Sequence, residues 1–285
     1  MDNKVPSDTD AMATIVREGA LLAGGARAIL LQIAHPSVGR GVADHSDFAN
    51  RAVDRLRTTL SYIYCVTFGT QQERREISRL VSAIHRKVTG PGYAALDPEL
   101  QLWVAATLYD TSAMLYRQWV GPLDEDAAEA AYQQYRVLGT ALQVRDEMWP
   151  ADRAAFRDYW DHMVATVEVT DHARGVCHDL LHPTSLPLPL RAGMPVNRFV
   201  TAGLLPERLR QAYGIRWDER RQQRFERFTR TVNAVYPMLP TTVRELPKTY
   251  FLWDMRRRFA REDTLSGANG ARSAPHAPTH LQAPR

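Results

Sequence analysis

The sequence predicts an all-α protein, folded as a single globular domain of many helices. Apolar residues recur at helical spacing along most of the chain. Short breaks rich in Gly and Pro separate these segments. No stretch shows a convincing strand, and strands do not alternate with helices as they would in a parallel sheet. These three observations favour a helical fold over any α/β architecture.

Size and composition are those of an ordinary globular protein. The chain has 285 residues, of which 45% are hydrophobic and 24% charged. Its two cysteines, Cys65 and Cys177, argue against a disulfide framework and are typical of a reducing compartment. We therefore expect the cytoplasm as its location.

The charge and the apolar runs indicate neither nucleic-acid binding nor a transmembrane span. The net charge is +4, and the arginines that cause it are dispersed over predicted helices, so nucleic-acid binding is not indicated. No apolar run reaches the roughly 18–20 residues that a transmembrane helix needs. The N-terminus lacks the basic and apolar regions of a signal peptide.

Element boundaries follow from caps and breaks. We expect residues 1–9 to be disordered, residues 10–262 to form the helical domain, and residues 263–285 to be a disordered tail rich in Gly, Ala, Ser and Pro. Asp10 can cap a first helix over residues 11–24. A nearly wholly apolar helix follows over residues 26–34 and ends where Pro36 follows His35.

Residues 37–45 form a short helical stretch with the small residues Gly39, Gly41 and Ala43. Small side chains allow close approach either of a neighbouring helix or of a flat ligand. The sequence leaves both interpretations open.

Two amphipathic helices follow, over residues 51–68 and 71–88. On the first, Arg55, Thr58, Thr59 and Tyr62 recur at helical spacing and are predicted to share a face. On the second, His85 lies at the edge of the apolar stripe.

Asp97 and Pro98 provide the cap and first residue of a long helix to about residue 120. Its aromatic residues are expected in the core, although they would line an apolar cofactor at the same spacing. Residues 185–195 hold three prolines and are predicted to be an extended connector. Further helices are predicted over residues 123–139, 150–170, 171–182, 207–213, 218–236 and 248–261.

Two sets of residues could carry chemistry. His178 and His182 stand four residues apart, so they could bind a metal with Asp171 or Asp179, or act only as caps at a helix end. A neutral His85 could ligate haem iron, with Arg55 near a propionate or bound oxygen and Thr58 and Thr59 lining the pocket. A lone histidine is more often structural.

Four stretches resemble one family closely: ALLAGGARAILLQIAHPSVGRGVADHS, RLRTTLSYIYCVTFGT, IHRKVTGPG and LDPELQLWVAATLYDT. It is the catalytic-domain family shared by bacterial latex clearing protein, a rubber oxygenase, and the fungal membrane-bound oxygenase of mycophenolic acid biosynthesis. The resemblance covers about residues 14–260.

The resemblance implies a globin-like core that holds haem b. It assigns the proximal iron ligand to His85 and the distal arginine and threonine to Arg55 and Thr59. Thr58 stands where the family pattern has a lysine, and Arg57 is an alternative to Arg55. Ala105 stands where many relatives have a histidine.

The resemblance also implies an enzyme that activates O₂ with haem and inserts it into a small apolar substrate, for which an isoprenoid or lipid-like molecule is expected. Two alternatives remain at this stage. One is a non-catalytic helical protein that binds an apolar ligand, which Thr58 and Ala105 motivate. The other is a metal-dependent enzyme that uses His178 and His182.

Overall fold

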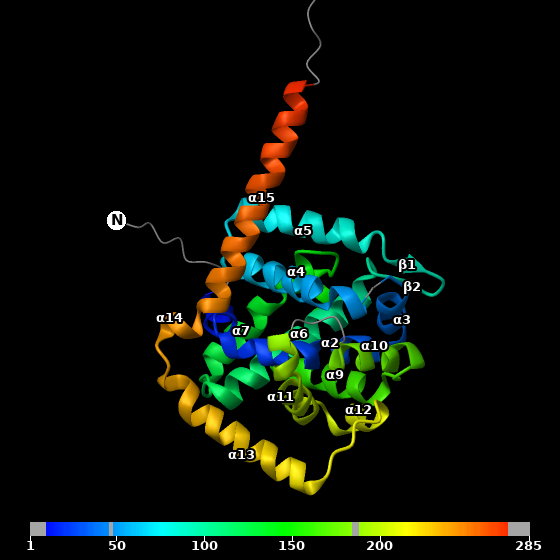
Figure 1. Ribbon diagram of the computed structural model, residues 1–285, viewed down its shortest axis with the longest axis vertical. Helices are drawn as coiled ribbons and strands as arrows, with labels where there is room; N and C mark the ends of the chain where they lie inside the picture. The colour runs from blue at the N-terminus through cyan, green and yellow to red at the C-terminus, as the bar shows by residue number, and fades with distance from the viewer. Residues whose placement is uncertain (1–9, 46–47, 184–187, 273–285) are drawn as a thin grey trace, which may run out of the picture.

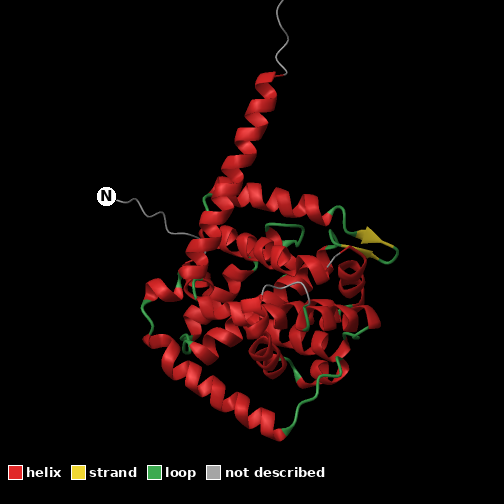
Figure 2. Ribbon diagram, viewed as in Figure 1, coloured by secondary structure: helices red, strands yellow, loops and turns green. Residues whose placement is uncertain are grey.

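The protein is almost entirely helical in the computed structural model, which describes residues 10–45, 48–183 and 188–272 (Figure 2). The one sheet among these residues is a hairpin of β1 (Thr89–Gly90) and β2 (Tyr93–Ala94), paired antiparallel. The all-α prediction is confirmed. The hairpin occupies a Gly-Pro-Gly turn that was predicted only as a helix break.

The N-terminal third of the chain forms the first six helical elements. They are α1 (Asp10–Val16), η1 (Gly19–Gly24), α2 (Gly25–Ala34), α3 (Pro36–His45), α4 (Phe48–Phe68) and α5 (Gln71–His85). A capping box starts α5: the Thr70 hydroxyl accepts from the Glu73 amide, and the Glu73 carboxylate accepts from the Thr70 amide. This cap turns the chain so that α5 runs back alongside α4 (Figure 1).

The central helix is α6 (Pro98–Trp119), which begins at the predicted Asp97 cap. It is buried along most of its length, because α1, α2, α7, α8, η1 and α13 all pack against it. Trp103, Tyr109 and Trp119 are buried, as predicted for its aromatic residues. Tyr109 packs edge-to-face against Phe156 and against Tyr132.

The remaining elements close the body around α6. They are α7 (Glu125–Tyr135), α8 (Val137–Thr140), η2 (Asp146–Met148), α9 (Arg153–Thr166), α10 (Asp171–Leu181), α11 (Leu188–Leu204), α12 (Glu207–Ala212), α13 (Glu219–Val235), η3 (Tyr236–Met238), α14 (Thr241–Arg244) and α15 (Leu246–Arg272). Side-chain oxygens of Asp124, Asp152, Thr170 and Asp218 cap four of these helices.

A buried guanidinium joins three of the helices. Arg27 of α2 is 3% exposed and pairs with Asp110 of α6 at 2.6 Å. It also donates to the Thr111 hydroxyl at 2.5 Å and to the Leu204 carbonyl at the end of α11 at 2.8 Å. These bonds fix how α2 lies against α6 and α11.

A second set of ion pairs ties α15 across α4 and α5. Asp254 accepts from Arg57 of α4 and lies 3.3 Å from Arg258. Arg256 pairs with Glu73 of α5 at 2.7 Å. The near part of α15 is thereby fixed to the body, while its far part projects beyond it (Figure 1).

Three boundary predictions were wrong. The first predicted helix is divided into α1 and η1. Residues 188–195, predicted as part of an extended connector, belong to α11; its Pro189 lies in the first turn, where proline is tolerated, but Pro195 lies inside the helix. The last helix continues to Arg272, because a glycine weakens a helix by only about 1 kcal/mol. Residues 1–9 and 273–285 lie outside the described residues.

The Arg27–Asp110 pair predicts a large and specific loss of stability. Asp110→Asn leaves a buried guanidinium without its counter-charge, so the free energy of unfolding should fall by about 3 kcal/mol. Urea unfolding followed by circular dichroism measures this change. Asp146→Asn is the matched control, because Asp146 is exposed and its contact with Arg136 spans 3.8 Å.

The double variant Arg27→Met/Asp110→Leu separates charge burial from packing. Replacing both charges by apolar side chains removes the unpaired charge, so this variant should lose less stability than Asp110→Asn. A loss equal to or greater than that of Asp110→Asn would contradict the assigned role.

Candidate functional site

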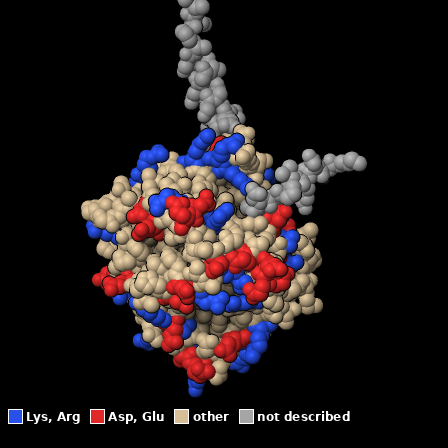
Figure 3. Space-filling model, turned by 180° about the vertical axis from the view of Figure 1, so that it is seen from behind, with Lys and Arg blue, Asp and Glu red and all other residues tan. Residues whose placement is uncertain are grey.

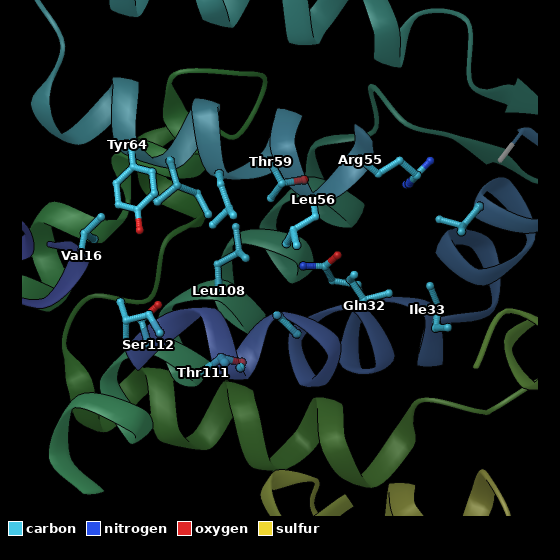
Figure 4. A pocket seen from close by; sticks show the side chains of 18 residues that line it. Val16, Gln32, Ile33, Arg55, Leu56, Thr59, Tyr64, Leu108, Thr111 and Ser112 are labelled. Carbon is cyan, nitrogen blue, oxygen red and sulfur yellow. The ribbon is translucent and has the colours of Figure 1, made fainter. Parts of the chain in front are cut away.

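A cavity lies between α2, α4 and α6, and η1 and α1 close one end of it. Its volume is about 110 Å³, and it is partly open to solvent. This is smaller than the usual site for a drug-sized ligand, so a large occupant would require the walls to move apart. Figure 4 shows side chains of α4 and of α2 and α6 directed towards one another across it. Its apolar walls include Leu21, Ala28, Ile29, Ile33, Val42, Leu56, Leu60, Ile63 and Leu108.

A few polar side chains interrupt these walls. Gln32 extends from α2 and Thr59 from α4, and neither side chain has a hydrogen-bond partner among the described residues (Figure 4). The Tyr64 hydroxyl also points into the space from α4, and burial raises the pKa of this phenol far above its usual range. The cavity therefore offers neutral hydrogen-bonding groups to an otherwise apolar occupant.

Arg55 connects the cavity with His85. It lines the cavity from the N-terminal half of α4 and is exposed. Burial lowers the pKa of His85, and the positive charge of Arg55 lowers it further. His85 is therefore neutral at physiological pH, which is the form that binds a metal.

Gln101, at the start of α6, lies beside His85. The Gln101 amide nitrogen donates to the Ala95 carbonyl at 2.7 Å and to the Gln143 side-chain oxygen at 2.6 Å, which uses both of its protons. Its contact with His85 Nδ1, at 3.5 Å, is therefore weak. The imidazole is held among polar neighbours without a strong hydrogen bond from Gln101.

The structure divides the predicted site residues. Arg55 and Thr59 line the cavity, whereas Arg57, Thr58 and His85 do not. Arg57 is engaged by Asp254 on the side of α4 that faces α15. Thr58 and Thr59 project about 100° apart because they are consecutive on a helix. The single face predicted for α4 is therefore two faces, of which one lines the cavity.

The small residues of α3 serve helix packing. A side chain at Gly39 would meet the Ile33 carbonyl at 2.5 Å, and one at Gly41 would meet the Tyr93 ring at 3.2 Å. Neither glycine lines the cavity. Of the two interpretations that the sequence left open, close helix packing is the one that the structure favours.

The other histidines separate into different roles. His45 Nε2 lies 3.2 Å from the Thr89 carbonyl and 3.0 Å from the Tyr93 hydroxyl, so it joins α3 to the hairpin. His35 is partly buried, and its Nδ1 has no partner among the described residues. Burial lowers the pKa of His35.

His178 and His182 are exposed at the C-terminal end of α10, where their rings stack with centroids 5.0 Å apart. The described part of the chain contains no group of three His, Cys, Asp or Glu that could hold a metal. Cys65 and Cys177 are free and buried, and burial raises the pKa of each thiol to about 12. Neither cysteine is poised as a nucleophile.

The sequence reasoning missed Gln32 and Tyr64. Gln32 was recognisable, because it is the one polar residue within the apolar run of residues 28–34, AILLQIA. Nothing in the spacing distinguished Tyr64 from an ordinary core tyrosine. Their common position becomes visible only when α2 and α4 are placed face to face.

Residues 13–234 match the family described as the catalytic domain of ER-bound oxygenase mpaB/B′ and rubber oxygenase. Two similar proteins are uncharacterised proteins of Mycobacterium tuberculosis and Mycobacterium bovis. Each is 36% identical over 244 residues, which covers 81% of this chain and 94% of the relative. No solved structure matches with significance. The globin-like character of the core therefore stays a prediction.

The effect of Arg55 on His85 gives a testable prediction. Arg55→Met removes a positive charge, so the pKa of His85 should rise towards its ordinary value, while burial keeps it below that value. An NMR titration of the ring signals measures the shift. Arg75→Met, an exposed change on α5, is the control and should leave the pKa of His85 unchanged.

The same shift has a consequence for stability. The folded state favours neutral His85. The contribution of His85 to the free energy of unfolding is therefore full above the pKa of the unfolded state, about 6.5, and decreases as the pH falls below that value. Arg55→Met should reduce this loss. Equal pH dependence of unfolding in Arg55→Met and wild type, or equal titration of His85 in both, would contradict the assigned contact.

Proposed function

The chain belongs to the family of the mpaB/B′ and rubber oxygenase catalytic domain, and from this premise we propose that it is a haem b-dependent oxygenase acting with O₂ on an apolar substrate. The observation that carries the proposal is the position of Arg55. This arginine lines an apolar cavity and also acts electrostatically on a neutral histidine, His85.

The residues fit haem b in chemical type. A partly buried imidazole that stays neutral is a suitable iron ligand, and an arginine beside it can neutralise a propionate. The cavity has the apolar lining that a cofactor or a hydrophobic ligand requires, and its small volume means that haem would have to displace the walls. When bound, haem b supplies the O₂ chemistry that side chains lack.

We assign the following roles to this chain's own residues. His85 would bind the iron of haem b, and Arg55 would bind a propionate and raise the local positive potential. Thr59 and Gln32 offer hydrogen bonds inside the cavity, and the aliphatic walls orient the substrate and exclude water. Thr58 lies next to this face. Arg57, which the resemblance offers as an alternative to Arg55, positions α4 through Asp254.

The apolar lining supports a small hydrophobic substrate, for which an isoprenoid or lipid-like molecule is the proposed class. No helix in the described part of the chain is long and apolar enough to cross a membrane. The cytoplasmic location stays a prediction.

A second candidate is a non-catalytic protein that binds an apolar ligand. It is favoured by one observation: the described residues that line the cavity include no His, Cys or Met, and His85 lies outside the lining. Such a protein would bind the ligand without consuming O₂.

The optical spectrum of the purified, haem-reconstituted protein tests the proposal. A Soret band should appear at a stoichiometry of one haem per chain, and His85→Ala should shift or abolish it because the iron loses its protein ligand. His178→Ala is the matched control, since His178 is exposed on α10 and should leave the spectrum unchanged.

Two outcomes would contradict the proposal. A protein that shows no Soret band, but carries a lipid-like molecule detected by mass spectrometry, would support the second candidate. An unchanged spectrum in His85→Ala would refute the ligand assignment. Metal analysis of protein prepared without haem tests the third possibility, a metal enzyme that uses His178 and His182, because only that enzyme would contain a bound metal.

A further inference from the structure

The start of α15 is apolar on two opposite sides, and only one of them is covered. On the inner side, Leu252 and Met255 are buried and Phe251 stacks on Tyr64 with ring centroids 6.0 Å apart. On the outer side, Leu246, Tyr250 and Trp253 are each more than half exposed. A contiguous exposed apolar face of this kind commonly marks an interaction site, and the outer side packs against no other helix among the described residues.

The exposed residues form a continuous stripe. Leu246, Tyr250, Trp253 and Arg257 are separated by four, three and four residues, which places them on one face of the helix. Tyr250 and Trp253 lie with ring centroids 6.2 Å apart, and the Arg257 guanidinium lies 5.3 Å from the centre of the Trp253 ring. We call this stripe the outer face of α15.

The segment before α15 adds further exposed apolar side chains. Met238 of η3 is 81% exposed, and Val243 of α14 is 45% exposed. Both stand close before Leu246 in the sequence, and α14 packs against α15. The apolar surface thus extends from the outer face of α15 towards η3.

Two arginines supply the positive charge beside this surface. Residues 235–261 contain six Lys or Arg, of which Arg244, Lys248, Arg256 and Arg258 pair with carboxylates of Glu18, Glu245, Glu73 and Asp254. Arg257 and Arg261 are exposed, and no acidic side chain among the described residues pairs with either. Figure 3 shows Lys and Arg side chains gathered at the end of the molecule where the described side chains of α15 stop.

We propose that the outer face of α15 docks on the surface of a lipid bilayer that carries anionic headgroups. Tyr and Trp are the aromatic residues enriched where a bilayer meets water, and exposed Leu and Met can enter the acyl boundary. Each Lys or Arg near an anionic surface adds about 1 kcal/mol. The stripe combines these features without a membrane-spanning segment.

Charge complementarity favours a bilayer over a second copy of this chain. In a dimer centred on Trp253, the Arg257 guanidinium would be buried beside an identical arginine with no carboxylate to pair with, which is unfavourable. At a bilayer surface, lipid phosphates receive the guanidinium while the ring enters the boundary. The proposal is independent of the haem oxygenase assignment, although Phe251 connects the same helix to Tyr64 in the cavity wall.

Co-sedimentation of the full chain with lipid vesicles tests the proposal. The protein should bind vesicles of phosphatidylcholine mixed with phosphatidylglycerol, and bind less to phosphatidylcholine alone or at high salt. The double variant Leu246→Ser/Trp253→Ser should bind about tenfold more weakly, since it loses most of the inserted apolar surface. Arg257→Gln should bind about fivefold more weakly to the anionic vesicles only.

The controls are an apolar and a basic residue of similar exposure elsewhere. Val196→Ser on α11, where Val196 is 57% exposed, and Arg224→Gln on α13 should both bind as wild type does. Unchanged unfolding midpoints establish that all variants are folded.

Three results would overturn the proposal. They are absence of binding to anionic vesicles, binding that the double variant leaves intact, and a dimer in light scattering that the double variant abolishes without any vesicle binding. The third would assign the outer face of α15 to a second copy of the chain.

Discussion

The buried guanidinium of Arg27 is the constraint on which the site depends. It is satisfied by Asp110, Thr111 and the Leu204 carbonyl, three groups from two other helices. A charge that is 3% exposed is stable only while all of these partners stay in place. The bonds fix α2 against α6 at the floor of the cavity, and Thr111 is itself a lining residue. The hydrogen bonds of Arg27 therefore fix the position of α2, which forms one wall of the space between α2 and α4.

The sequence predicted a helix boundary correctly where a cap residue or a proline determines it by local chemistry. Asp97 and Pro98 specify a helix start by their own chemistry, and the structure begins α6 there. Pro195 gave the opposite signal, yet α11 passes through it. That helix packs against α2, η1 and α13, and such packing overrides a local preference that no single segment reveals.

Two of the five residues proposed from the sequence line the cavity, for a geometric reason. Arg55 and Thr59 are four residues apart on α4, so both reach the cavity, while Arg57 is turned to Asp254. Periodicity could place these residues on a helix but not decide which face meets α2. Gln32, a polar residue in an apolar run, gave a usable signal. The outer face of α15 could not be predicted, because an apolar stripe in a sequence does not show whether other helices cover it.

The central claim is that His85 and the cavity beside Arg55 form one haem site. X-ray diffraction from crystals of the haem-loaded protein, with anomalous scattering recorded at the iron absorption edge, locates the iron without reference to any assumed ligand. The account predicts a single iron peak within bonding distance of a His85 ring nitrogen, with a propionate close to the Arg55 guanidinium. An iron peak bound to another side chain, or no ordered iron in a protein that holds a different molecule between α2 and α4, would contradict it.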